Sequence, residues 1–375
     1  MFGKNNVLKA FYKGLIRPML FSFDPLIVHE KFAELGGFFG RHKLTKSFLK
    51  SLFHYKNPSL GQNLFGIDFE NPVGLAAGFD YDGNLTGVLA EMGFGFGTVG
   101  TITNMAYEGN PGVQLKRLIK SRSILVNKGF KNIGAHAMAQ KLSGVRFGRP
   151  IGISIGRTNT SLLKSEKDSI SDILSAFRVF EEAAVNHSYY ELNISCPNLI
   201  HADDNVSFYK QKSLENLLRN IDELKIKRPI FVKMPISEDD KTVLDLLYVI
   251  LRYDVKAVIF GNLQRDRGNE TFVREEVEAC GRGNFSGIPC RERSNELISL
   301  AFRHFGKNLK IVGCGGILSP YDAYEKIRRG ASLLQMITGM IFEGPQVIST
   351  VNKGIVEHLK KDGFKSIQEA IGVGF

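Results

Sequence analysis

The stretch YYELNISCPN, residues 189–198, begins as a buried strand and ends in amides, a thiol and a proline. Seven other short runs are similarly apolar, namely PVGLAA (72–77), FGTVGT (96–101), PIGISI (150–155), PIFVKM (229–234), KAVIFG (256–261), LKIVGC (309–314) and SLLQMI (332–337). Strands that are apolar on both faces are typical of parallel sheets covered by helices. Helix-like segments lie between the runs, and eight βα units in roughly 290 residues predict a (β/α)8 TIM barrel.

The first 60 residues differ from the rest, so we expect two domains: a helical extension over residues 1–60 and the barrel over residues 61–375. Residues 5–23 place apolar side chains at helical spacing with basic residues between them, and Pro18 is expected to kink or end this helix. A second helix is expected between a cap at Asp24 and a stop at Gly36 and Gly37, and a third over residues 45–55. Two interpretations stay open: these helices pack only on the barrel, or they also lie on a membrane surface.

Composition narrows the possible partners. The chain has 375 residues, of which 43% are hydrophobic and 23% charged, and its net charge is +11. This charge suits an anionic membrane surface or an anionic substrate, and no nucleic-acid-binding motif accompanies it. No secretory signal and no apolar run near 18 residues is found, so no transmembrane helix is expected. The four cysteines show no metal-ligand spacing, which favours reduced thiols and no metal site.

The residues that follow the strands predict the chemistry, because active sites of such barrels form at the C-terminal ends of the strands. Glycine clusters follow the seventh and eighth runs, at 313–316 and 338–339, where exposed backbone N–H groups suit a phosphate. Lys233 lies within a buried strand and needs an electron-rich ligand or, alternatively, a carboxylate partner. Several amides at the same mouth suit a planar ligand such as a pyrimidine; they are Asn127, Asn193, Asn198 and Asn262.

Taken in order, six motifs resemble those of dihydroorotate dehydrogenases, which are flavin mononucleotide (FMN) enzymes of pyrimidine biosynthesis. The motifs are NPVGLAAGFDYDG, GFGTVGT, LNISCPN, VKMP, IVGCGGI and GASLLQMITGMIFEGP. The N-terminal LFSFDPLIVHEKFAELG is similar to the helical extension of the membrane-associated, quinone-using branch. The resemblance implies FMN-dependent oxidation of dihydroorotate to orotate, with electrons passing to a membrane quinone through an apolar tunnel. It also implies a peripheral protein of the bacterial inner membrane, at its cytoplasmic face, or of the mitochondrial inner membrane.

The resemblance implies a role for each matching residue. Cys196 would be the base that removes the C5 proton of dihydroorotate while a hydride passes from C6 to flavin N5. A free thiol with a pKa of about 8.5 supplies some thiolate near neutral pH. The substrate would be held by Asn127, Phe130, Asn193, Asn198 and Asn262. FMN would be bound by Ala76, Ala77, Gly78, Thr101, Ser154, Asn193, Lys233, Gly261, Gly287, Gly315, Gly316, Thr338 and Gly339, with Lys233 stabilising negative charge on the reduced flavin.

This chain departs from the family pattern at several positions. Cys196 is typical of the soluble branch, whereas the quinone branch usually carries serine there. Tyr81 replaces a usual lysine, Ser154 an expected asparagine and Leu263 an expected threonine or serine, and the loop at residues 126–132 is one residue shorter. Two further hypotheses therefore stand beside the quinone enzyme: the same half-reaction with a soluble acceptor such as fumarate or NAD, and a non-catalytic flavin-binding barrel.

Overall fold

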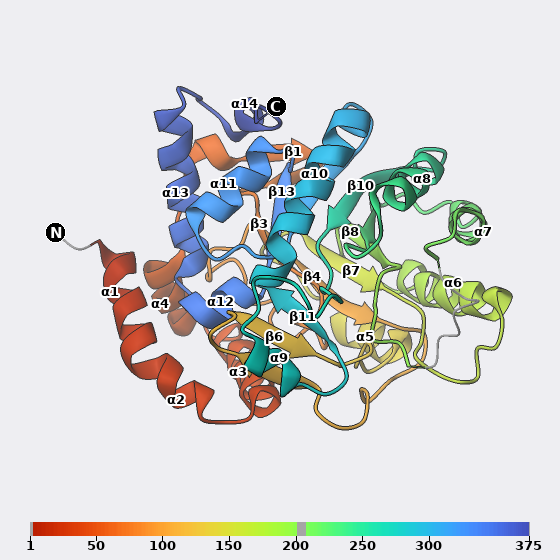
Figure 1. Ribbon diagram of the computed structural model, residues 1–375, viewed down its shortest axis with the longest axis horizontal. Coiled ribbons are helices and arrows are strands. Elements are labelled where there is room, and N and C mark those ends of the chain that lie inside the picture. Colours follow the sequence, from red (N-terminus) through yellow and green to blue (C-terminus); the bar gives the residue numbers. More distant parts are fainter. Residues whose placement is uncertain (1–2, 201–207, 375) are drawn as a thin grey trace.

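The eight apolar runs form a closed parallel barrel in the computed structural model, which describes residues 3–200 and 208–374. Its strands are β3 (Val73–Leu75), β4 (Phe96–Ile102), β7 (Ile151–Ile155), β8 (Tyr189–Asn193), β9 (Ile230–Met234), β10 (Val255–Phe260), β12 (Lys310–Cys314) and β13 (Leu333–Met336). Each strand pairs with the next in chain order, and β13 closes the barrel against β3 (Figure 1). The predicted TIM barrel is confirmed.

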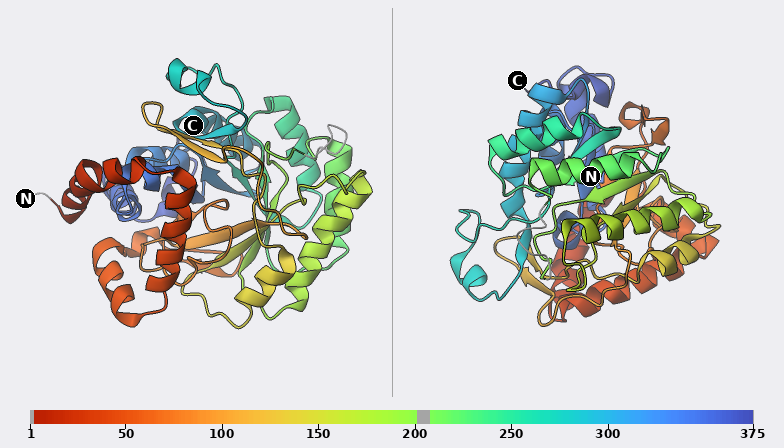
Figure 2. Two further views of the ribbon diagram at one scale, coloured as in Figure 1. Left: turned by 90° about the horizontal axis from the view of Figure 1, so that it is seen from below. Right: turned by 90° about the vertical axis from the view of Figure 1, so that its right-hand side faces the viewer.

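Helices surround the barrel and follow every strand except β3, whose connection to β4 consists of turns, so the expected alternation holds for seven of the eight units. They are α5 (Ala135–Leu142), α6 (Glu166–Glu182), α7 (Gln211–Asp222), α8 (Asp240–Ile250), α10 (Arg291–Phe305), α11 (Pro320–Arg328) and α13 (Val347–Lys361). Shorter helices are η2 (Pro58–Leu60), α9 (Arg274–Glu278), η4 (Ile288–Cys290), α12 (Thr338–Glu343) and α14 (Ile367–Ala370). Figure 2 shows these helices around the strands from two further directions.

The barrel interior has an aromatic layer at the N-terminal ends of the strands. Tyr189 stacks on Phe231 with ring centroids 4.6 Å apart, and Phe96 meets Phe69 at 5.3 Å. Phe69 belongs to a hairpin of β1 (Gln62–Leu64) and β2 (Ile67–Phe69), which sequence analysis did not predict. Because side chains alternate along a strand, the next inward position on each strand lies one layer closer to the mouth. On β4, β7, β8, β9 and β13 those positions carry polar side chains that form part of the candidate site, namely Thr98, Ser154, Glu191, Lys233 and Gln335.

The long gaps after the second and sixth barrel strands contain a small antiparallel sheet, which we call the cap sheet. It consists of β5 (Leu115–Leu118), β6 (Ser123–Val126) and β11 (Asn284–Gly287), in the order β11-β6-β5. Its strands contribute Leu115, Ile124, Val126 and Ser286 to the lining of a cavity at the barrel mouth.

The N-terminal segment is helical, with α1 (Lys4–Phe11), a π-helical turn (Tyr12–Ile16), α2 (Arg17–Phe21), α3 (Pro25–Phe39) and α4 (Lys43–Phe53). Asp24 caps α3 as expected, accepting a hydrogen bond from Leu26 N at 2.8 Å. Pro18 does not end the first helix, which continues to Phe21 after the π-helical turn. The expected stop at Gly36 and Gly37 is wrong, since α3 runs on to Phe39. A side chain at Gly36 would collide with Leu85, so this glycine allows close packing on the barrel.

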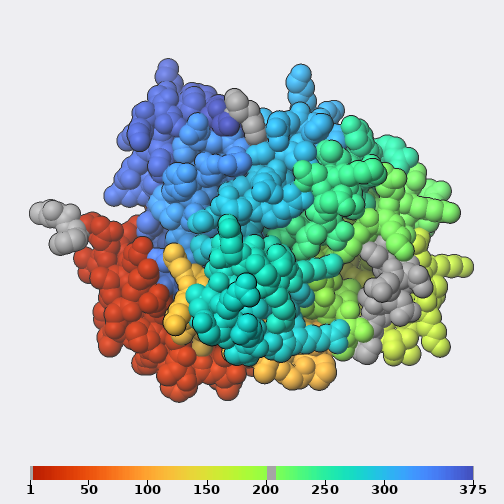
Figure 3. All heavy atoms as spheres, in the orientation of Figure 1, coloured from red at the N-terminus to blue at the C-terminus, as the bar shows by residue number. Residues whose placement is uncertain are grey.

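Ion pairs hold the N-terminal helices against the C-terminal part of the barrel. The buried carboxylate of Glu343 accepts contacts from Lys9 Nζ at 2.9 Å and Lys13 Nζ at 2.8 Å, and it also pairs with Arg122. Tyr12 donates a hydrogen bond from its hydroxyl to Ile341 O at 2.7 Å. Figure 3 shows the N-terminal helices in red beside the C-terminal helices in blue. No helix in residues 3–200 or 208–374 is long and apolar enough to cross a membrane.

Candidate active site

A cavity of about 460 Å³ lies between the N-terminal helices and the barrel mouth, and we call it the main cavity. Its outer part, the apolar chamber, is lined by side chains that include Leu20, Phe32, Leu35, Leu49, Phe53 and Leu115. A smaller inner cavity of about 90 Å³ lies at the ends of β12 and β13. The two share lining residues such as Ala77, Lys233, Asn262 and Thr338, so they adjoin each other.

Most of the residues predicted for the site line one of these cavities. The main cavity is lined by Ala77, Gly78, Thr101, Phe130, Asn193, Cys196, Asn198, Lys233, Asn262 and Thr338. The inner cavity is also lined by Ala76, Gly261, Gly287, Gly315, Gly316 and Gly339. Two predicted residues line neither. Asn127 lies beside Asn198 in a hydrogen-bond network, and Ser154 lies in the buried polar layer beneath the mouth.

The inner cavity is lined largely by backbone, because glycines stand where a side chain would fill the space. We call this glycine-lined part, which includes Gly315, Gly316 and Gly339, the cradle. Gly316 has a φ of +71°, and a Cβ there would collide with the side chain of Arg291. A Cβ at Gly339 would collide with the carbonyl oxygen of Ile317. Thr338 Oγ1 lies 2.8 Å from Ser286 Oγ at the edge of this cradle. Close backbone approach and small hydroxyl side chains fit the phosphate end of an elongated cofactor.

The predicted amides belong to a larger network whose centre sequence analysis missed. Asn110 donates from Nδ2 to Asn127 Oδ1 and to Asn198 O, both at 2.8 Å. Asn284 of the cap sheet donates to Asn198 Oδ1 at 2.7 Å. Asn110 precedes Pro111 in a loop, a position where asparagine is an ordinary turn residue, so its sequence gave no signal of this role.

Two amides fix the segment that carries Cys196. Asn262 donates from Nδ2 to Ser195 O at 2.8 Å, and Asn193 Oδ1 accepts from Ser195 N at 3.3 Å. Cys196 is partly exposed in the main cavity. Although the residue is partly exposed, burial of its thiol raises the pKa to about 12, against the opposing effects of the Asn198 backbone N–H, Arg265 and Lys233. This pKa lies above that of an ordinary thiol, so the surroundings of Cys196 favour the neutral form near neutral pH.

Lys233 has a carboxylate partner that sequence analysis did not name. Its Nζ lies 3.4 Å from Oε1 of Glu191 on the neighbouring strand, and both side chains are buried. Burial lowers the pKa of Lys233, but Glu191, with smaller contributions from Cys314 and Cys196, more than offsets it, so the pKa is raised overall. Glu191 also accepts from Ser154 Oγ at 3.2 Å and from Gln335 Nε2 at 3.1 Å. The signal was a charged residue inside the apolar run YYELN, two positions before Asn193 and therefore on the same inward face.

Comparison with known proteins identifies the family. Residues 59–359 match the family model for dihydroorotate dehydrogenase. The chain belongs to the dihydroorotate dehydrogenase family. It is similar to a protein named dihydroorotate dehydrogenase (quinone) from Nostoc punctiforme, at 35% identity over 96% of this chain and 98% of the relative. A relative of the same name from Christiangramia forsetii is 33% identical, with 92% and 99% covered.

Solved dihydroorotate dehydrogenase structures agree in fold. The Eimeria tenella enzyme in complex with ferulenol has a TM-score of 0.79 and 26% identity, with 93% of this chain and 95% of that chain covered. The region matched by the family model contains every barrel strand and all the predicted site residues. The N-terminal helices precede that region, yet the similarity to the quinone-named relative from Nostoc punctiforme covers 96% of this chain. The helical extension is thus largely shared with such a relative.

Proposed function

We propose that this protein oxidises dihydroorotate to orotate with FMN and passes the electrons to a membrane quinone. The observation that carries the proposal is the meeting of three features at one barrel mouth: the amide network around Cys196, the backbone cradle, and the apolar chamber. Family membership supports the reaction, and the quinone-named relatives support the acceptor.

Different residues at the barrel mouth bind the substrate and remove its proton. Asn127, Asn193, Asn198 and Asn262 hold the planar substrate ring, with Phe130 in the loop beside it. Cys196 removes the C5 proton, a step that needs the deprotonated thiol. Positioning by the flanking amides directs Cys196 at one hydrogen of the substrate.

The residues between the amides and the cradle would hold FMN. FMN, when bound, takes up the hydride released from C6 of the substrate. Lys233, held by Glu191, supplies a fixed positive charge at the flavin ring. Ala76, Ala77, Gly78 and Thr101 would line the flavin ring, with Ser154 in the polar layer beneath it and Gly261 beside it. The ribityl phosphate end would be held by Gly287, Gly315, Gly316, Thr338 and Gly339.

The N-terminal helices bind the membrane surface on one side and line the apolar chamber for the quinone on the other. Their outward side exposes large apolar side chains, including Val7, Phe11, Leu15, Met19, Leu44 and Phe48. Lysines lie among these positions, as in surface-bound amphipathic helices that bind anionic lipid. We therefore assign residues 1–60 as a peripheral membrane extension and residues 61–375 as the catalytic barrel, at an inner membrane face.

The acceptor is tested by mixing dihydroorotate-reduced protein, without oxygen, with ubiquinone, menaquinone, fumarate or NAD. The apolar chamber predicts that either quinone reoxidises the flavin much faster than fumarate or NAD. Faster reoxidation by fumarate or NAD would contradict the quinone assignment. It would support the alternative of a soluble electron acceptor, which a cysteine at position 196 favours.

A further inference from the structure

Two buried nitrogen atoms line the inner part of the apolar chamber without a hydrogen-bond partner. They are Lys128 Nζ and His29 Nε2, and the parent side chains are 8% and 9% exposed. Within residues 3–200 and 208–374, neither atom meets an acceptor or donor. Buried polar atoms are normally paired, so an unpaired lysine beside a cavity indicates a partner that enters the cavity.

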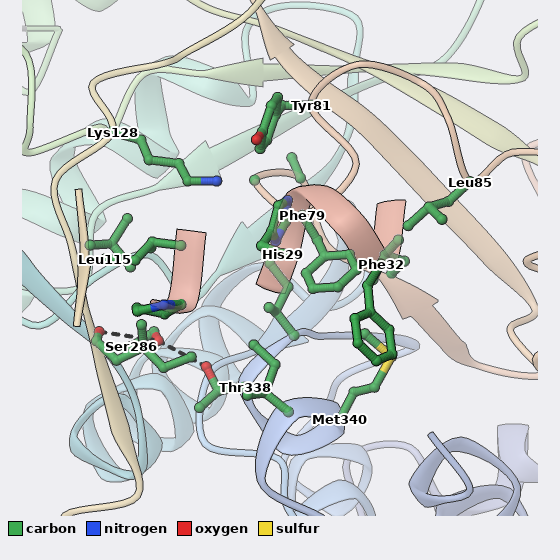
Figure 4. Close-up of a pocket in the computed structure, with 18 of the residues that line it drawn as sticks. His29, Phe32, Phe79, Tyr81, Leu85, Leu115, Lys128, Ser286, Thr338 and Met340 are labelled. Carbon is green, nitrogen blue, oxygen red and sulfur yellow. Dashed lines mark hydrogen bonds between the residues drawn. The ribbon is translucent and has the colours of Figure 1, made fainter. Parts of the chain in front are cut away.

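Both side chains are packed around Tyr81. Lys128 Nζ lies 4.0 Å from the centroid of the Tyr81 ring, and the His29 ring stacks on Tyr81 with centroids 5.2 Å apart. Figure 4 shows Lys128 extending into the pocket toward Tyr81 and His29. A cation over an aromatic face is held in place while its N–H groups stay available for a ligand.

The nearest ionic groups do not neutralise Lys128. Lys131 on the same loop pairs with Glu30 of α3 at 2.8 Å, so that carboxylate already has a partner. The charged and titratable groups around Lys128 are His29 and Glu30 on α3, Tyr81 and Asp82 after β3, and Lys131 on its own loop. Of these groups, His29, Tyr81 and Lys131 line the main cavity together with Lys128.

The surroundings select the kind of ligand. The same pocket is lined by apolar side chains such as Phe32, Phe79 and Met340. A ligand that fits here is mostly apolar and carries one exposed acceptor, a description met by the carbonyl-bearing ring of a quinone. We propose that Lys128 donates a hydrogen bond to a carbonyl oxygen of the quinone and fixes its ring near the flavin. This inference rests on the proposed quinone activity.

The pKa of Lys128 predicts a pH dependence of quinone affinity, which can be measured separately. Burial lowers its pKa to about 7, with Lys131 adding to the effect, while Glu30 and Asp82 oppose it. The ammonium is the better donor to a carbonyl oxygen. Quinone affinity is therefore expected to fall as the pH rises above about 7.

The test measures quinone binding to the oxidised holoenzyme by titration calorimetry with a short-chain ubiquinone analogue. Lys128→Met should raise the Kd about tenfold or more, since a charge-assisted hydrogen bond is lost. It should also remove the pH dependence seen in the unmodified protein. Lys120→Met, in the exposed turn between β5 and β6, makes the same charge change and should leave the Kd within about twofold. Orotate binding, followed by the flavin absorbance, should be unchanged in both variants.

Stability supplies an independent readout. Removing a buried, unpaired ammonium should raise the melting temperature of Lys128→Met, whereas a structural lysine would lower it when removed. Lys128→Gln keeps an uncharged donor and should give an intermediate Kd.

Three results would overturn the inference. An unchanged quinone Kd with weakened orotate binding would assign Lys128 to the substrate carboxylate. Unchanged binding of both would leave it as a packing partner of Tyr81, and a pH-independent quinone Kd in the unmodified protein would remove the cationic role. These results differ from failure of the proposed function, in which no quinone reoxidises the unmodified reduced protein.

Discussion

Lys233 and Glu191 face each other on adjacent barrel strands, with Nζ and Oε1 3.4 Å apart and both side chains buried beneath the mouth. The pair connects the predicted flavin contact to a polar layer that also contains Ser154 and Gln335. A buried charge is costly when it is unpaired, so the position and protonation of Lys233 depend on Glu191.

Glu191→Gln should therefore destabilise the protein by about 3–5 kcal/mol, because it leaves Lys233 buried without a countercharge. Urea denaturation measures the loss, and the Glu191→Gln/Lys233→Met double variant should recover part of it. Glu215→Gln removes an exposed pair with Arg252 at 2.9 Å and should cost only about 0–1 kcal/mol. Equal midpoints for Glu191→Gln and Glu215→Gln would show that the buried pair is not structural.

The pair also predicts a pH dependence of stability. The pKa of Lys233 is higher in the folded protein than that of an ordinary lysine, because Glu191, with smaller contributions from Cys314 and Cys196, more than offsets burial. The stabilisation from this pair is thus fully present below the ordinary lysine pKa and is lost as the pH rises through the raised value. Glu191→Gln should lack that alkaline loss, which unfolding measured across alkaline pH would detect.

Cys196 predicts the pH profile of flavin reduction. With its pKa raised by burial to about 12, the rate should keep rising with pH across the range 7–10, because the thiolate fraction is small throughout. Cys196→Ala should slow this step by roughly 10²–10⁴-fold, with Cys196→Ser between. Cys280→Ala removes a buried thiol that packs against the cap sheet, and it should leave the rate of flavin reduction unchanged. Anaerobic stopped-flow absorbance reports the rate, and an unaltered rate and profile in Cys196→Ala would make the thiol a packing residue.

Gly316 predicts where the cofactor phosphate binds. Gly316→Val places a branched side chain at a φ of +71° and against Arg291, and it should release FMN during gel filtration. Gly363 after α13 has a φ of +81° and open space around it, so Gly363→Val controls for backbone strain alone. The ratio of flavin to protein absorbance measures retention. A folded Gly316→Val protein with full flavin content would refute the phosphate assignment.

The exposed apolar side chains of the N-terminal helices predict membrane binding. Replacing Phe11, Leu15 and Phe48 together by serine should weaken binding to vesicles containing anionic lipid at least tenfold. High salt should weaken binding of the unmodified protein without abolishing it, because apolar insertion does not depend on salt. The control is the replacement of Tyr248 and Tyr321, which are exposed on α8 and α11, by serine, and it should leave vesicle binding unchanged. Cosedimentation measures binding, and equal binding of both variants would contradict a membrane role for the helices.

The barrel was predictable because its signal is local: each strand is an apolar run, and the turns between them carry glycine and asparagine. The site was predictable only where polar residues directly follow a strand, as Cys196 and Asn198 do. Glu191 and Asn110 were missed because their roles depend on partners distant in sequence, Gln335 and Asn198. The stop at Gly36 failed for a similar reason, since packing against Leu85 on the barrel outweighs the low helix propensity of glycine. The raised pKa of Cys196 likewise follows from tertiary burial, which no local pattern records.

The central claim is that this barrel mouth oxidises dihydroorotate with its own flavin. The most direct measurement is the flavin absorbance of the purified protein mixed with dihydroorotate in the absence of oxygen. The account predicts that the absorbance of the oxidised flavin is lost, that orotate forms in proportion to the flavin, and that added quinone restores the absorbance. A protein that retains its flavin but is never bleached by dihydroorotate would contradict the account and leave a flavin-binding barrel without this activity.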